Sequence, residues 1–539
     1  MKKILKSIIV LLMGSLIGLS SACTSSFEKD NTDETGFPDD KQDLDFNKYG
    51  LKLLIVQKGI YFNYNWGAGL NWPFQVMQNL GADMFAGYFH DAKDNFFMHN
   101  STYNLNDSWT SANWINTYGY IMPAIYTSEE LTETENYPSF LGITKILKVA
   151  TMHRIADQYG PLVYSNFGSK TGSDPESLKD AYDHFFEDLE EGIQLIQDFV
   201  AKNPGIESYY KFDILTATRT YDEWLRFANS LRLRLAMRIS DVDSAKAAEM
   251  VQKCIDSKID FLEPETHLIS VSTVGSGYNN PLGEINKAWN EAYINASMES
   301  FLVGFNDPRL PKYFEKATGS GEGKYLFDIK GTYKGIRQGI NVSHGNYSGH
   351  SKSTITQSTN AILMTPAEVY FLLAEAALKG YVTTGSARAF YEEGVKASFM
   401  QWGVGNQSDA YLESKATPAD FKDALDSRFD AKAMTDITPK WDEADTNERK
   451  LERIITQKWI ACYPEGVEAW SEQRRTGYPK LFKVYENNSN GTIDTDVMIR
   501  RIPFPAALQS DNPDQYNKLL ELLGGPNNGG TRLWWQQRR

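Results

Sequence analysis

Residues 139–158 read SFLGITKILKVATMHRIADQ, and residues 178–202 read LKDAYDHFFEDLEEGIQLIQDFVAK. In both stretches apolar side chains recur at helical spacings, which is typical of helices that bury one face. The two stretches are separated by a polar, Gly- and Ser-containing segment, so we predict two adjacent helices that form a pair. The apolar positions are Leu141, Ile146, Val149 and Ile155 in the first stretch and Tyr182, Phe186, Leu189, Ile193 and Ile196 in the second.

The same pattern continues along the chain. Thr365 and Pro366 form a helix start, since threonine caps and proline suits the first turn. Short polar turns join neighbouring helices, as in helix-pair repeats of the tetratricopeptide type, although the sequence lacks a clean 34-residue consensus. We therefore predict a mainly α fold, a superhelix of tetratricopeptide-like helix pairs. Further helices are predicted over 221–240, 241–258, 365–378, 385–400 and 449–463.

Three long stretches rich in Gly, Asn and Ser interrupt the helices, at 268–284, 316–360 and 484–500. Loops of this length inside a compact domain are usually functional. We therefore predict that irregular loops carry the ligand site and that the helices form the scaffold.

The N-terminus has the order of a secretory signal. A basic start precedes an apolar run from Ile8 to Leu19, which at about twelve residues is too short for the roughly 20 that a spanning helix needs. We predict that residues 1–22 are removed and that Cys23 carries lipid, as in bacterial lipoproteins. The alternative is an ordinary signal cut nearby with Cys23 incidental, because Ser20 stands where a lipoprotein signal usually has Leu.

Residues 23–45 are acidic and nearly free of apolar side chains, which predicts a flexible tether. Residues 46–539 contain no Pro- or Ser-rich linker and are predicted to form a single domain. The chain has a formal charge of −14, and loss of the signal takes away three lysines and leaves −17. This balance argues against a nucleic-acid partner, since such binders need a basic face.

Cysteine and aromatic residues are the other informative classes. Beyond Cys23 the chain has Cys254 and Cys462, which could pair, although free buried thiols are favoured. The chain contains 12 Trp, 29 Tyr and 28 Phe, together 13% of residues. Surplus amphipathic aromatics often line surfaces that meet sugars or protein partners.

Motifs for catalysis are lacking in this sequence. It contains neither His-Glu-x-x-His nor Gly-x-Ser-x-Gly, and the Gly-rich run at 319–325 lacks the spacing of a phosphate loop. His344 and His350 share a loop without a ligand cluster, so we expect no metal and no cofactor. A pair of glycosidase carboxylates leaves no trace in a sequence, so a surface glycan hydrolase stays an alternative.

Six motifs, taken in order, resemble one family. They occur at 154–165 (RIADQYGPLVYS), 229–239 (NSLRLRLAMRI), 306–310 (NDPRL), 368–376 (EVYFLLAEA), 457–475 (from QKW to RR) and 500–517 (from RRIPFP to YN). Together with Cys23 they resemble the SusD/RagB outer-membrane lipoproteins over nearly the whole chain. Pro161 replaces the Asp that is usual in the family, which indicates a divergent SusD-like branch.

The resemblance implies four tetratricopeptide-like helix pairs that carry an irregular ligand-binding part. It implies a lipid anchor in the outer membrane, facing the cell exterior. It also implies a partner, a SusC-like TonB-dependent transporter, to which the protein passes captured oligosaccharide or peptide without catalysis. A purely structural lid with negligible affinity for ligand is a further alternative.

Three loops, 99–114, 276–293 and 333–350, combine aromatic rings with amides and charged groups, as sugar recognition requires. Trp109, Tyr278 and Trp289 are the preferred ligand contacts. For each of these aromatics the alternative is packing of the loop. The other predicted contacts are Tyr103, Asn104, Asn280, Tyr293 and Tyr347.

Other aromatic and charged groups are predicted to be structural. Trp114 is expected to face the core, and Trp534 and Trp535 to dock the C-terminal tail. A cluster formed by Tyr61, Phe62, Tyr64, Trp66 and Trp72 is interpreted as packing or partner contact. Arg232, Arg234 and Arg238 cannot all share one helix face and are expected to pair with acidic helices such as 187–191, and Glu368 and Glu375 to pair between helices.

Overall fold

The computed structural model describes residues 46–61, 72–92, 98–169, 173–208, 210–319, 329–342 and 344–537. The predicted signal peptide, Cys23 and the tether lie outside the described residues. The chain divides at Gly50 into two units, and the second, Leu51–Arg539, contains the elements discussed below apart from the first turn of α4 (Asn47–Gly59). In the described part of the chain, no helix is both long and apolar enough to span a bilayer.

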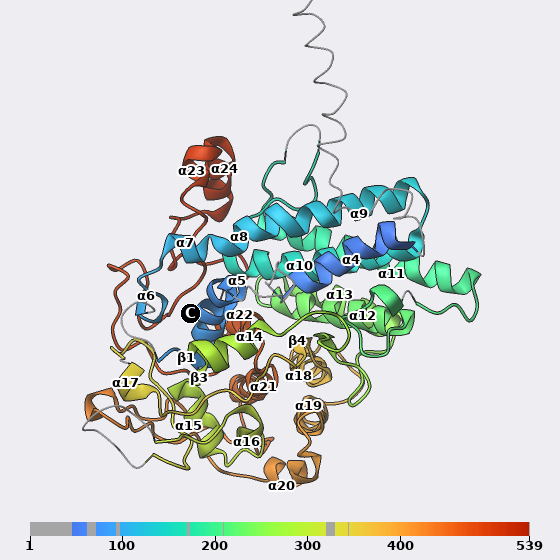
Figure 1. Ribbon diagram of the computed structural model, residues 1–539. Coiled ribbons are helices and arrows are strands. Elements are labelled where there is room, and N and C mark those ends of the chain that lie inside the picture. The colour runs from blue at the N-terminus through green and yellow to red at the C-terminus, as the bar shows by residue number, and fades with distance from the viewer. Residues whose placement is uncertain are drawn as a thin grey trace, which may run out of the picture. The chain divides into compact units, whose positions relative to one another are not determined.

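Paired helices dominate the second unit, as predicted (Figure 1). α10 packs on α11, α12 on α13, α18 on α19, and α21 on α22. These helices are α10 (Pro138–Tyr159), α11 (Leu178–Lys202), α12 (Tyr221–Arg238), α13 (Ser244–Asp256), α18 (Pro366–Leu378), α19 (Ala387–Gln401), α21 (Asn447–Ala461) and α22 (Gly466–Thr476).

Local chemistry explains where these helices begin and how closely they cross. Thr365 accepts a hydrogen bond from the Glu368 amide and Pro366 fills the first turn of α18, which confirms the predicted start. α10 and α11 approach closely at Gly142 and Gly192, where a Cβ on Gly142 would lie 2.8 Å from the Gly192 carbonyl oxygen. Only glycine fits this crossing without displacing one helix.

Shorter helices and turns connect the pairs. The π-helical turns η2 (Gln75–Asp83), η4 (Thr117–Ile121) and η6 (Ile285–Trp289) continue α5, α8 and α14. The remaining helices are α5 (Trp72–Phe74), α6 (Met98–Ser101), α7 (Asp107–Thr110), α8 (Ala112–Asn116), α9 (Met122–Thr134), α14 (Pro281–Glu284), α15 (Ala296–Gly304), α16 (Leu310–Tyr313), α17 (His344–Tyr347), α20 (Ser408–Leu412), α23 (Leu508–Asp511) and α24 (Pro513–Leu523). Three 3-10 turns are η5 (Tyr210–Phe212), η7 (Gly405–Gln407) and η8 (Ser427–Phe429).

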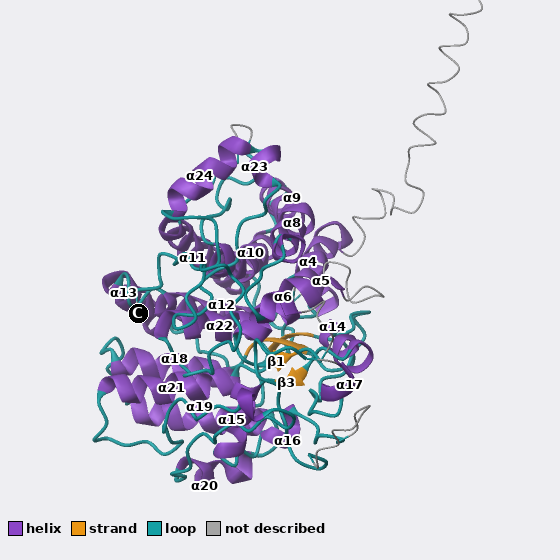
Figure 2. Ribbon diagram, turned by 90° about the vertical axis from the view of Figure 1, so that its left-hand side faces the viewer, coloured by secondary structure: helices purple, strands orange, loops and turns teal. Residues whose placement is uncertain are grey.

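Two small antiparallel sheets fix the long loops. β1 (Phe89–His90) pairs with β3 (Tyr293–Ile294), and β2 (Ile269–Val271) pairs with β4 (Ala361–Met364). Figure 2 shows β1 and β3 together among long loop connections. The stretch 268–284, predicted as loop, therefore contains a strand and a short helix, while 484–500 is irregular as predicted.

The centre of the helical pairs holds charged side chains, which we call the buried ion network. Arg238 bridges three helices, since it contacts Asp157 on α10 at 3.1 Å, Glu468 on α22 at 2.5 Å, and Glu472. Arg234 donates two hydrogen bonds of 2.7 Å to the Glu368 carboxylate. The other members, each at most 1% exposed as a side chain except for Glu472 at 3%, are Lys458, Arg475, Glu375 and Glu472.

Charge pairing decides which of these groups ionise. Burial would raise the pKa of Glu468, but Arg238, Lys458 and Arg234 outweigh it and hold the pKa at about 2. The pKa of Glu368 is raised, because burial and the neighbouring Glu468 outweigh Arg234 and Lys458. The network therefore keeps Glu468 charged at physiological pH by surrounding it with three cations.

The predicted roles of the arginine-rich helix are confirmed. Arg232 binds Glu190 in the acidic stretch 187–191 at 2.8 Å. Glu368 and Glu375 pair between helices, the latter with Arg475 at 2.6 Å. Removing one member of such a buried pair leaves the others without a counter-charge.

Three further predictions are confirmed in the core. Cys254 and Cys462 are free and buried. Trp114 is buried and packs edge-on against Tyr159. Trp535 is fully buried beside Arg238 and Arg474, so the C-terminal tail docks on the body.

We predict that Arg238→Met lowers the free energy of unfolding by about 3–5 kcal/mol, because Asp157, Glu468 and Glu472 lose their shared cation. The matched control is Arg388→Met, which removes an exposed pair with Glu392 and should change stability by less than about 1 kcal/mol. Urea denaturation followed by circular dichroism measures both. Equal effects of the two substitutions would contradict a structural role for the network.

His153 on α10 makes stability depend on pH. It is 3% exposed, and burial, followed by the nearby Arg234, lowers its pKa from 6.5 to about 3. The unfolded chain therefore binds this proton near pH 6.5 and the folded chain does not. The stability that His153 contributes is complete above pH 6.5 and is lost as the pH falls toward 3.

His153→Gln should remove this dependence. From about pH 7.5 to about pH 5, the unfolding free energy of the native protein should fall by about 2 kcal/mol relative to the variant. Denaturant titrations of both proteins at the two pH values measure the difference. If the two proteins differ in unfolding free energy by the same amount at both pH values, the folded protein accepts the proton at His153.

Candidate functional site

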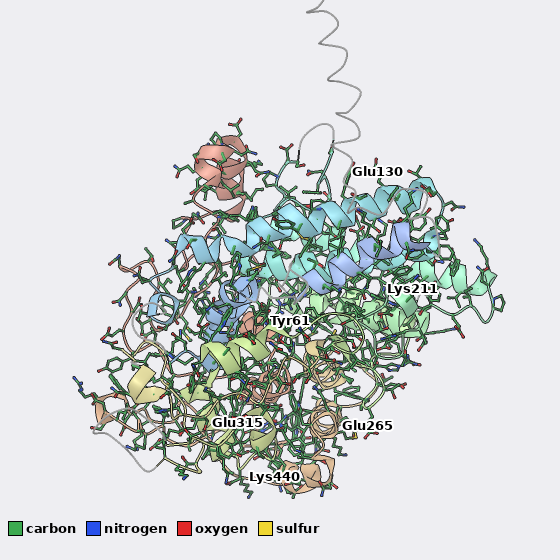
Figure 3. The ribbon with its side chains drawn as sticks, viewed as in Figure 1. Tyr61, Glu130, Lys211, Glu265, Glu315 and Lys440 are labelled. Carbon is green, nitrogen blue, oxygen red and sulfur yellow. The ribbon has the colours of Figure 1, made fainter. Side chains whose placement is uncertain are left out.

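The first part of the candidate site is the start of the helix formed by α5 and η2. Phe74 is fully buried and stacks on Tyr61 with ring centroids 4.9 Å apart. Pro73 occupies the first turn, and Trp72, just before it, is 42% exposed. The buried pair therefore fixes a helix end that presents an indole ring to solvent; Figure 3 labels Tyr61.

The second part is the turn from α14 into η6. Asn280 accepts a hydrogen bond from the Leu282 amide and donates to the Thr359 carbonyl at 3.0 Å, so it caps α14 and ties it to a distant loop. The helix ends at Asn290, which has a left-handed backbone (φ 59°). Trp289, the last helical residue, is partly exposed.

Hydrogen bonds join these two parts. Gln75 donates to Glu291 at 2.5 Å, and Asn79 donates to the Glu291 carbonyl at 3.2 Å. Gln75 follows Trp72 by one turn, and Glu291 follows Trp289 by two residues, so the bond joins the two segments that carry these tryptophans, although Glu291 itself is only 1% exposed. α14 also contacts α5 and η2. We call the accessible area around Trp72 and Trp289 the tryptophan surface.

Several polar groups lie on α14, η6 and the loops bonded to them. Gln357 donates to Glu284 at 2.6 Å, and Lys352 donates to Asn290. Lys287 pairs with Glu315 at 2.6 Å, and both side chains are about half exposed. Glu315 is labelled in Figure 3. Amides and charged groups beside flat apolar rings are the combination that a sugar requires, since its hydroxyls need forked donors and acceptors.

Buried hydrogen bonds attach η2 to the helical core. Arg154 donates to Glu465 at 2.7 Å and to Gln78 at 3.0 Å, so α10, η2 and the start of α22 share one cluster. Asp83 accepts from the Gly466 amide at 3.1 Å, and burial, followed by Glu465, raises its pKa well above the usual value. The helix that carries Trp72 is therefore fastened to the core.

Most of the predicted ligand contacts are buried in the structure. Trp109 is 8% exposed and packs on Leu80 and Met84. Tyr278 is 1% exposed. Burying an apolar ring stabilises the folded chain more than leaving the ring in water. These buried rings therefore anchor their loops. The other buried side chains are Tyr103, Asn280, Tyr293 and Tyr347.

Two predicted contacts are accessible. Asn104 is exposed and Trp289 is partly exposed. For all eight residues, contact with a ligand stays a prediction; the six buried ones could contact a ligand only after local rearrangement.

Sequence reasoning missed Trp72, Gln75 and Lys352 as members of an exposed surface. Trp72 was assigned to a packing or partner-contact cluster, whose members Phe62, Tyr64 and Trp66 lie outside the described residues. One signal was present, because a proline after Trp72 indicates that a helix starts there. The pairing of Gln75 with Glu291, 216 positions apart, has no sequence signal.

The family model "Susd and RagB outer membrane lipoprotein" matches residues 29–536. The chain belongs to the SusD-like family. This SusD-like protein contains the predicted family motifs at buried positions: Arg154, Asp157, Arg238, Glu368 and Arg475 all lie in the core. No curated protein matches the sequence.

Solved structures give the same result. A SusD homologue from Bacteroides vulgatus is 46% identical with a TM-score of 0.86, covering 92% of this chain and 99% of that one. A chitin-binding SusD homologue from Flavobacterium johnsoniae is 34% identical with a TM-score of 0.84 and the same coverage. A homologue from Bacteroides thetaiotaomicron is 30% identical with a TM-score of 0.81, covering 91% and 99%.

The described residues of this SusD-like protein contain no group of three or more His, Cys, Asp or Glu side chains placed to hold a metal ion. The buried carboxylates of the ion network are bound by arginine and lysine, so they are not available to a substrate.

Gly283 of α14 packs closely against the loop at Gln357, next to the tryptophan surface. A Cβ at this position would lie 2.1 Å from the Gln357 amide nitrogen, so Gly283→Ala must push α14 from the loop behind it. We predict a loss of about 1–3 kcal/mol of unfolding free energy and a shift in Trp fluorescence. Gly81→Ala is the matched control, since a Cβ there meets no heavy atom within 4 Å outside the backbone of its own helix. If neither substitution lowers the free energy of unfolding, Gly283 does not pack closely against the loop at Gln357.

Proposed function

We propose that this SusD-like protein captures oligosaccharide at the cell surface, held there by lipid on Cys23, and delivers it to a SusC-like TonB-dependent transporter. Oligosaccharide is preferred over peptide. The observation that carries the proposal is the tryptophan surface, where the exposed indole of Trp72 and the partly exposed indole of Trp289 lie on elements that also carry amides and charged groups.

The physical fit is to pyranose rings. The C–H face of a sugar stacks on an indole, and the exposed side chains of Lys287, Glu315 and Gln357 supply donors and acceptors for hydroxyls. These side chains are already bonded before ligand arrives, so little side-chain entropy remains to be lost on binding. A preformed aromatic surface of this kind suits capture.

The relatives support the choice of ligand class. The chitin-binding homologue from Flavobacterium johnsoniae is 34% identical over 92% of this chain. Oligomers of N-acetylglucosamine are therefore the first ligands to test. Transport by a partner barrel and anchoring through Cys23 are supported by membership in a family of outer-membrane lipoproteins.

We predict that Trp72→Ala and Trp289→Ala each weaken the binding of an N-acetylglucosamine oligomer by about 1 kcal/mol, a factor of about five, because each removes one stacking face. Isothermal titration calorimetry measures the dissociation constants. Tyr120→Ala is the matched control, since Tyr120 is 51% exposed and lies on η4, outside the tryptophan surface.

Two outcomes would contradict the proposal. Unchanged affinity in both tryptophan variants would place the ligand elsewhere. Release of new reducing ends from the oligomer, abolished by changing one carboxylate, would make the protein a hydrolase.

A further inference from the structure

A cavity of about 430 Å³ lies among the repeat helices and shares no residue with the tryptophan surface. Residues of α9, α10, α11 and the turn 164–167 form its walls. Its volume falls within the range of about 300–1,000 Å³ that is typical of small-molecule sites. The cavity is open to solvent, and Glu130 of α9, one of its lining residues, is exposed and labelled in Figure 3.

Aromatic rings form one wall of this cavity. Tyr126 is 37% exposed and meets Phe167 edge to face, with ring centroids 6.2 Å apart. Tyr164 is buried deeper, and the Lys148 ammonium already lies over its ring at 4.7 Å from the centroid. The cavity thus contains one ammonium–aromatic contact within the protein and a second, exposed ring without such a partner in the described residues.

The two lysines of the cavity are neutralised within the protein. Lys145 contacts Asp188 at 3.1 Å, and Lys148 contacts Glu129 at 3.1 Å and Asp188 at 3.2 Å. Burial alone would raise the pKa of Asp188, but Lys148 and Lys145 outweigh it and lower the pKa. The base of the cavity is therefore a satisfied group of ion pairs.

The rim of the cavity, in contrast to its base, carries carboxylates without a counter-charge among the described residues. Glu130, Glu133 and Glu187 line the cavity, are exposed, and form no ion pair with any described residue. Because the lysines below them are already paired, these three carboxylates leave the cavity with an excess of negative charge. An anionic ligand would be repelled, and a neutral one would gain nothing from the charge.

We propose that this cavity binds an organic ammonium ion, with the cation between the Tyr126 ring and the rim carboxylates. A cation over an aromatic face is attracted by the ring quadrupole, and nearby carboxylates add to that attraction. The aromatic wall covers the carbon skeleton that bears the amine. The described residues offer no cluster of three metal ligands, so a bare metal ion is a poor fit.

An ammonium of this kind has two chemical sources at a cell surface. One is an amino sugar that lacks its acetyl group, and the other is a lysine side chain of a peptide. Both sources present the same ammonium group, so the experiment must distinguish the amino sugar from the lysine side chain. This inference does not depend on the tryptophan surface, and a variant that lacks both tryptophans isolates the cavity.

The test uses the mature protein carrying Trp72→Ala and Trp289→Ala, so that stacking at the tryptophan surface is removed. The probes are a glucosamine tetramer at about pH 6, its fully N-acetylated counterpart, and trilysine. Calorimetry should show binding of at least one amine probe, weakened by high salt, and no binding of the acetylated tetramer. Binding of only one amine probe identifies the source.

Substitutions then locate the amine probe. Glu130→Gln and Glu187→Gln should each weaken binding about fivefold, and Tyr126→Ala about threefold. Glu265→Gln is the matched control, because Glu265 is an exposed carboxylate on a different part of the unit (Figure 3). It should leave affinity unchanged.

Three results would overturn the inference. The first is that neither amine probe binds. The second is that Glu265→Gln weakens binding as much as Glu130→Gln, which would indicate general attraction to an acidic protein. The third is that the acetylated tetramer competes with the amine probe for the cavity.

Discussion

Arg238 and the carboxylates around it are the constraint on which the rest of the structure depends. One guanidinium, 1% exposed, reaches Asp157, Glu468 and Glu472 on two other helices. Charges buried this deeply lose their hydration, and only close, well-directed partners offset that loss. The helices that carry these groups can therefore pack only in an arrangement that brings all partners within contact distance.

The network also explains how a helical scaffold positions a loop-built surface. α10 and the start of α22 contact η2 through Arg154, Glu465 and Gln78. η2 continues α5, and Gln75 at its start holds Glu291 beside Trp289. α10 and α22 carry members of the buried ion network, and the Arg154–Glu465–Gln78 bonds attach the same two helices to η2, so a change in their packing would be felt at η2.

Much of this arrangement could be predicted, and the limits have physical reasons. Helical period, the cap at Thr365 and the pairing of Arg232 with 187–191 are local or follow from charge, and the structure confirms them. Side-chain exposure in loops depends on distant contacts. Trp109 packs on Leu80 and Met84, and Tyr278 is buried, although each stands in a polar stretch. Trp72 belongs to a cluster interpreted as packing or partner contact, and its exposure depends on Phe74 taking the buried position beside Tyr61.

We propose that the core holds Trp72 and Trp289 in the positions that bind a sugar. A crystal structure of the protein with a bound N-acetylglucosamine oligomer would test this proposal. We expect pyranose rings stacked on both indoles, the Gln75–Glu291 bond intact, and helices α10, α12 and α22 unmoved. Sugar density elsewhere with both indoles bare, or a surface that forms only after η2 shifts from Glu465, would contradict it.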